Sequence, residues 1–191
     1  MGKIGVTIKG QGSFEDIKAN LMLLADTEVL AGFPEDKTDR APEVGEPANI
    51  TNASLAYIHD NGAPDANIPA RPFMGPAMEE ARERVANKLG QILLAVLTKG
   101  GDSHMVEQAM HQVGLIAQTA IKNTINAGVP PPLAPATLRA RARKGRKGAA
   151  LELLSRSKGY APAMDFAKPL VDTAKMINAA SYAIRSRKKR K

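Results

Sequence analysis

Three histidines are the side chains best suited to acid–base chemistry or metal binding, but their spacing supports neither. His104 and His111 are seven residues apart, which on a helix puts them on one face but about 10 Å apart, too far to share a metal ion. His59 precedes Asp60, yet no nucleophile or second ligand set lies at an informative spacing. The chain has no cysteine and no phosphate-loop, catalytic-serine or zinc motif. The sequence therefore predicts a protein that is not an enzyme and uses no cofactor or metal.

Arg71 stands out among the charged residues because it lies inside a proline-rich segment, residues 67–76. Proline disfavours helix at the residue before it, so this segment is predicted to be a stiff, extended arm ahead of a helix from Ala77. A guanidinium there suits a bidentate pair with a carboxylate, and Asp60 is the nearest in sequence. That pair would hold the arm to its own domain; alternatively, the arm reaches a neighbouring subunit. Phe73 is expected to anchor a core or an interface.

Positive charge is concentrated in the last quarter of the chain. Residues 1–138 carry 11 Lys/Arg and 16 Asp/Glu, a net of −5, whereas residues 139–191 carry 16 and 3, a net of +13, which together give the +8 of the whole chain. No aromatic residue lies within the first basic cluster, residues 139–147, so the pattern favours sequence-independent contact with phosphates or an acidic protein surface rather than base stacking. A solvated helix face is the alternative. The residues concerned are Arg139, Arg141, Arg143, Lys144, Arg146 and Lys147, and at the C-terminus Arg187, Lys188, Lys189, Arg190 and Lys191.

The elements that must position these residues follow from hydrophobic periodicity and capping signals. One domain is expected over residues 1–185, with a long polar loop at 35–49 and a basic, disordered tail at 186–191. Residues 145–165 give no clear pattern. Strands are predicted at 3–9, 27–33 and 181–185. Short helices are predicted at 14–25 with Ser13 as the N-cap, at about 52–60, from Pro135 or Ala136 onward, and at 173–177 with Asp172 as the N-cap. A long helical hairpin is predicted at about 77–99 and 103–127.

The chain has no run of apolar residues long enough for a membrane span, and its N-terminus lacks the pattern of a signal peptide. We therefore expect a protein of the cytoplasm, or one assembled there.

Three segments carry a family resemblance. Residues 55–63 lead into 68–78, which read I-P-A-R-P-F-M-G-P-A-M; residues 131–138 read P-P-L-A-P-A-T-L; and residues 168–178 read K-P-L-V-D-T-A-K-M-I-N. In this order they resemble the small neck or tail-completion (virion morphogenesis) proteins of tailed bacteriophages, over about residues 50–185. Two positions depart from the family pattern: Asp60 replaces a glutamate, and Ala174 replaces a glycine, so the turn at 174 must avoid positive φ or accept strain.

The resemblance implies an α+β subunit in which several helices pack on a small antiparallel sheet, with extended proline-rich arms. It also implies a ring, expected to be a hexamer, around the DNA channel at the head–tail joint of the virion, where it mediates head–tail joining. Its partners would be further copies of itself, the adjacent connector, the tail terminator or tail tube proteins, and possible non-specific contact with genomic DNA. The motif residues given interface roles are Asp60, Ile68, Pro69, Arg71, Pro72, Phe73, Pro76, Asp172 and Thr173.

The sequence is also compatible with two other functions. A tail terminator that caps the tail tube is a close alternative within the same class. A free protein that binds DNA independently of sequence, through the basic residues near the C-terminus, is an alternative of another class. An enzyme such as a nuclease is disfavoured, because no metal-binding constellation occurs.

Overall fold

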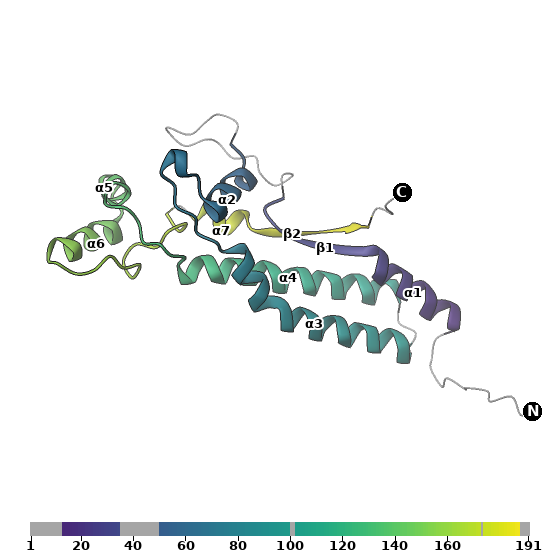
Figure 1. Ribbon diagram of the computed structural model, residues 1–191. Coiled ribbons are helices and arrows are strands. Elements are labelled where there is room, and N and C mark those ends of the chain that lie inside the picture. Colours follow the sequence, from purple (N-terminus) through teal and green to yellow (C-terminus); the bar gives the residue numbers. More distant parts are fainter. Residues whose placement is uncertain (1–12, 35–49, 100–101, 173, 188–191) are drawn as a thin grey trace, which may run out of the picture. The chain divides into compact units, whose positions relative to one another are not determined.

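The computed structural model describes residues 13–34, 50–99, 102–172 and 174–187. These residues form the predicted α+β fold, in which a two-stranded antiparallel sheet accompanies mostly helical structure (Figure 1). No helix within these ranges is both long and apolar enough to cross a bilayer. The elements in chain order are α1 (Phe14–Asp26), β1 (Thr27–Gly32), α2 (Asn52–Asn61), the 3-10 turn η2 (Pro64–Ala66), α3 (Met74–Lys99), α4 (Ser103–Ala127), α5 (Pro135–Arg143), α6 (Lys147–Ser157), α7 (Lys175–Ala179) and β2 (Ser181–Ser186).

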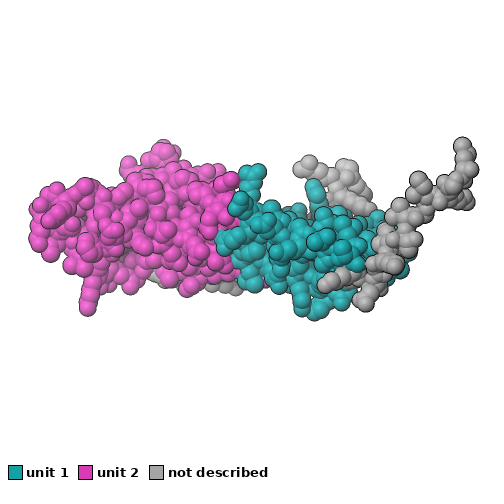
Figure 2. Space-filling model, turned by 90° about the horizontal axis from the view of Figure 1, so that it is seen from below, with its two compact units in different colours: residues 1–30, 82–116, 183–191 teal, residues 31–81, 117–182 magenta. Residues whose placement is uncertain are grey.

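The chain forms two compact units, which are coloured separately in Figure 2. Unit 1 comprises residues 1–30, 82–116 and 183–191, and unit 2 comprises residues 31–81 and 117–182. The two long helices contribute residues to both units. Each unit has its own cluster of buried apolar side chains.

The core of unit 1 is made by α1, α3 and α4. α1 begins as predicted at Ser13, whose Oγ accepts a hydrogen bond from the Asp16 backbone N–H at 3.1 Å, while Asp16 accepts one from the Ser13 N–H. The helical hairpin is also confirmed, because Ile92 and Val96 of α3 pack with Val106 of α4. The same cluster contains Ile17 and Ala109, with Leu21, Leu23, Leu24, Leu89 and Met105 around it.

The sheet consists of the predicted second and last strands. β1 pairs with β2, and Glu28 of β1 forms an ion pair with Arg185 of β2. The strand predicted at residues 3–9 and the polar loop predicted at 35–49 lie outside the described residues, as do residues 188–191 of the basic tail.

Unit 2 contains α2, α5 and α6. Thr51 is the N-cap of α2, and Gly62 is its C-cap, with a φ of 80° that favours glycine. α5 begins at Pro135, as predicted, with its proline in the first turn, where a missing N–H costs nothing. α6 was not predicted, because it has no side-chain cap and Gly148 lies within it. That glycine permits close packing, since a Cβ there would lie 2.0 Å from the Phe166 carbonyl oxygen.

Within the described residues, extended proline-rich arms are not shown, and both proline segments pack against the rest of the chain. Ile68 forms an isolated bridge with Ala63, and the Arg71 N–H donates to the His59 carbonyl at 2.8 Å, so this segment folds back along α2. α3 begins at Met74 rather than Ala77. Pro76 is tolerated because the first four N–H groups of a helix have no partner within the helix. The second proline segment is likewise packed, since Val129 and Leu133 are buried.

The prediction that Asp172 caps the last short helix was wrong. α7 begins at Lys175, and its N-cap position is Ala174, in the left-handed region at φ 55°. Asp172 is instead engaged by arginines. Of the two possibilities at position 174, the chain therefore accepts the strained conformation, which costs an alanine about 1 kcal/mol or more.

Replacing Ala174 by glycine is expected to stabilise the protein. Ala174→Gly relieves the steric cost of φ 55°, so the free energy of unfolding should rise by about 0.5–1 kcal/mol and the melting temperature by about 1–4 °C. Ala150→Gly, at an exposed position within the right-handed helix α6, is the control and should destabilise by a similar amount. A melting temperature for Ala174→Gly at or below the wild-type value would contradict this account.

Candidate functional site

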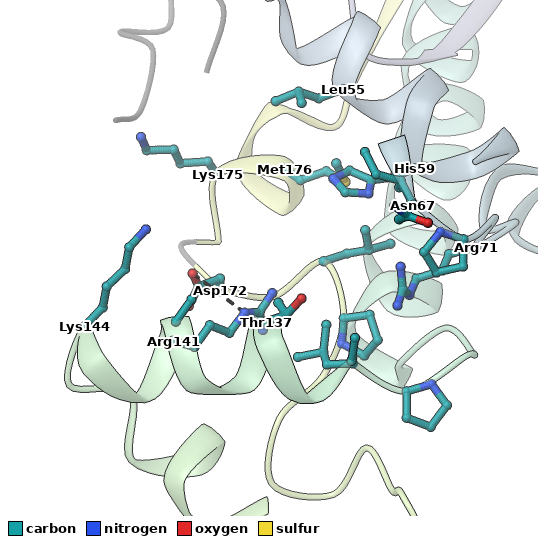
Figure 3. Close-up of a pocket in the computed structure, with 18 of the residues that line it drawn as sticks. Leu55, His59, Asn67, Arg71, Thr137, Arg141, Lys144, Asp172, Lys175 and Met176 are labelled. Carbon is teal, nitrogen blue, oxygen red and sulfur yellow. Dashed lines mark ion pairs between the residues drawn. The ribbon is translucent and has the colours of Figure 1, made fainter. Parts of the chain in front are cut away.

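A cavity of about 470 Å³ lies in unit 2, where the three motif segments of the sequence come together (Figure 3). α2 and the segment after it form one wall, and α5 with the residues before it forms another. The lining is completed by Pro169, Leu170, Asp172, Lys175 and Met176. The cavity is lined by Asn52, Leu55, His59, Asn67, Ile68, Pro69, Arg71, Pro132, Leu133, Ala134, Thr137, Ala140, Arg141, Lys144, Pro169, Leu170, Asp172, Lys175 and Met176.

Arg71 is the most deeply buried cationic side chain of this cavity. It is only 6% exposed, and its Nε donates to the Pro131 carbonyl oxygen at 3.0 Å. Its pKa is lowered by burial and, to a smaller extent, by the nearby positive charge of Arg141. Figure 3 shows Arg71 directed from the α2 side toward Arg141 on α5. Among the described residues, the Arg71 side chain therefore contacts its own chain through a backbone carbonyl.

Asp60 does not pair with Arg71, contrary to the proposed ion pair. Its Oδ1 accepts hydrogen bonds from the backbone N–H groups of Phe73 at 2.8 Å and Met74 at 3.0 Å. These N–H groups lie at the start of α3, where unpaired donors and the helix dipole favour a negative charge. The acidic residue of the motif thus caps α3.

Phe73 is a core residue of unit 2. Its side chain is fully buried and meets the ring of Phe33 edge to face, with centroids 6.0 Å apart at 87°. Ile68 and Pro69 line the cavity, whereas Pro72 and Pro76 are exposed. Thr173 lies outside the described residues.

The basic cluster predicted as one surface is divided in the structure. Asp172 accepts from Arg146 Nε at 3.0 Å and lies 3.8 Å from Arg141 Nε, while Arg141 Nη1 donates to the Lys168 carbonyl at 2.9 Å. The pKa of Arg141 is lowered by burial, although Asp172 opposes this. The members that face solvent without a described ion pair are Arg139, Arg143, Lys144 and Lys147, and Arg187 is exposed after β2.

The three histidines lie on two helices, α2 and α4. His104 and His111 are exposed on α4, and His59 of α2 lines the cavity. His104 Nε2 lies 2.9 Å from the side-chain amide nitrogen of Gln108. Within the described ranges, no three metal-binding side chains cluster together.

Unit 2 contains a buried polar network that was not predicted from the sequence. Glu152 of α6 is 1% exposed, and its Oε1 accepts from Arg156 Nε at 2.8 Å and from the Ala163 backbone N–H at 2.9 Å. Arg156 Nη1 also donates to the Leu133 carbonyl at 2.8 Å, which ties α6 to the cavity wall. The sequence signal that could have predicted this ion pair is the spacing of four residues between Glu152 and Arg156, which places both side chains on one helix face.

Comparison with known proteins gave no further guide to function: no family model matches the chain, and no significantly similar curated protein or solved structure was found.

Proposed function

We propose that this protein is a structural subunit of the head–tail joint of a tailed bacteriophage, a neck or tail-completion protein that assembles into a ring around the DNA channel and mediates head–tail joining. The chemistry of such a protein is binding and geometry. The three motif segments support the proposal through their order in the sequence and through their meeting around one cavity in unit 2.

The observation that carries the proposal is an exposed apolar face on α3. Leu93, Leu94 and Leu97 lie within about one helical turn, and they are 42%, 62% and 45% exposed. They are far more exposed than Ile92 and Val96, the buried residues of the same stretch of α3. Apolar groups gathered on one exposed face are typical of surfaces that a protein partner covers.

A second copy of the same chain is the partner that fits best. Residues 1–138 are net negative and residues 139–191 strongly positive, so successive copies attract each other when the acidic part of one meets the basic part of the next. A contact between two different surfaces of identical chains closes into a ring when the rotation permits.

The leucine face is tested by the Leu94→Glu, Leu97→Glu double variant. Burying two carboxylates against an apolar surface is strongly unfavourable, so we expect an assembly-deficient protein with an unchanged far-ultraviolet circular dichroism spectrum. Leu154→Glu is the matched control, because Leu154 is similarly exposed but lies on α6, and it should assemble normally. A double variant with the wild-type mass distribution would show that this face makes no subunit contact.

Sequence-independent DNA binding is a second candidate, and the exposed arginines and lysines of α5 and its C-terminal end favour it. It predicts that the purified protein binds duplex DNA with an affinity that falls steeply as salt is added. Replacing Arg139, Arg143, Lys144 and Lys147 with glutamine should abolish that binding. If the same variant loses assembly but not DNA affinity, these side chains contact protein instead.

A further inference from the structure

The cavity of unit 2 combines buried positive charge with an apolar lining. Its wall carries four cationic side chains, Arg71, Arg141, Lys144 and Lys175, against a single carboxylate, Asp172. That carboxylate is already shared between Arg141 and Arg146. Among the described lining residues, the cationic side chains of Arg71, Arg141 and Lys144 therefore outnumber the carboxylate of Asp172.

Arg71 is the most deeply buried of these cationic side chains. Its Nε is satisfied by the Pro131 carbonyl, and within the described part of the chain its two terminal nitrogens make no ion pair. These nitrogens are not sealed in the protein either, since Arg71 lines the open cavity. A guanidinium held in this way presents paired N–H donors in the fixed fork that matches a carboxylate.

We propose that this cavity binds a carboxylate carried on a short aliphatic stem, with the carboxylate on Arg71 and Arg141 and the stem against the apolar wall. Leu55, Ile68, Leu170 and Met176 supply that wall. Because Arg71 is 94% buried, the phosphates of a DNA duplex cannot reach it. The carboxylate comes either from a small free acid or from a glutamate side chain of a protein partner, and both present the same group.

The site is tested by calorimetric titration of the full chain with glutarate at constant ionic strength. We expect saturable binding to one site per chain. Arg71→Lys keeps the charge but loses the fork, which removes a charge-assisted hydrogen bond and should weaken binding about tenfold or more. A capped Gly-Glu-Gly peptide is titrated in parallel. Binding of the peptide at least as tightly as glutarate identifies a protein side chain as the source, and binding of glutarate alone identifies a free acid.

A second variant keeps the test decisive if Arg71→Lys fails to fold. Ala140→Phe places a ring in the cavity from the exposed side of α5 and leaves every charged group in place, so it should abolish binding at an unchanged melting temperature. Ala150→Phe, on an exposed position of α6 outside the cavity, is the matched control and should bind like the wild type. Absence of glutarate and peptide binding to the wild type, binding that survives Ala140→Phe, or tighter binding of inorganic phosphate than of glutarate would each overturn the proposal.

Discussion

Glu152→Ala is expected to destabilise the protein by about 3–5 kcal/mol. The side chain is 1% exposed and accepts hydrogen bonds from Arg156 and from the Ala163 N–H. Removal of this carboxylate leaves the largely buried Arg156 guanidinium without its counter-ion and the Ala163 N–H without an acceptor. Urea unfolding followed by circular dichroism measures the loss. Glu107→Ala, at an exposed position on α4, is the control and should change stability by no more than about 0.5 kcal/mol.

The same carboxylate also gives stability a dependence on pH. Burial raises the pKa of Glu152, but the hydrogen bonds from Ala163 and Arg156, with the Arg156 charge, outweigh it and leave the pKa lowered. The stabilisation is therefore complete above the unfolded-state pKa of about 4.3 and disappears as pH falls through the lower folded-state value. The stability difference between wild type and Glu152→Gln should narrow below about pH 4. A difference that stays constant from pH 7 to pH 3 would contradict this role.

Phe73→Ala should cost about 3–5 kcal/mol, because it opens a cavity where a fully buried ring packs against Phe33. Thermal and urea unfolding of the purified variant measure the loss. Phe14→Ala is the matched control, since Phe14 is 72% exposed, and its stability should remain close to that of the wild type. A stable Phe73→Ala variant that fails only in assembly would instead make Phe73 an interface anchor.

Helices and strands were predictable where periodicity and caps agree. The buried stripes of α3 and α4 were read correctly from the spacing of Val96, Val106, Val113 and Ile121, and Ser13 marked the start of α1. These signals are local, so a single sequence contains them. The two-stranded pairing of β1 with β2 also follows the strands that alternation predicted.

The course of the proline segment was not predictable from local rules. Proline fixes φ and excludes the α region before it, but it does not specify what the segment packs against. Three long-range contacts decide the outcome: Asp60 with the start of α3, Arg71 with the Pro131 carbonyl, and Phe73 with Phe33. Arg71 was identified as informative because of its residue type, but its partner lies 60 residues away.

Capping at position 174 illustrates the same limit. Asp172 has the residue type of an N-cap, yet its carboxylate is taken by Arg146 and Arg141, which the fold brings to it from 26 and 31 positions earlier in the chain. The helix α7 then starts from an alanine in the left-handed region. A long-range ion pair overrode a local preference worth about 1 kcal/mol.

The most direct test of the proposed role is the native mass of the purified full-length protein, measured alone and after mixing with the other head–tail joint proteins of the same virus. We predict one discrete oligomer, a hexameric ring, that persists at micromolar concentration and enters the larger joint complex. A protein that remains monomeric in both samples, at every concentration measured, would contradict the proposal that this chain is a ring-forming subunit of the head–tail joint.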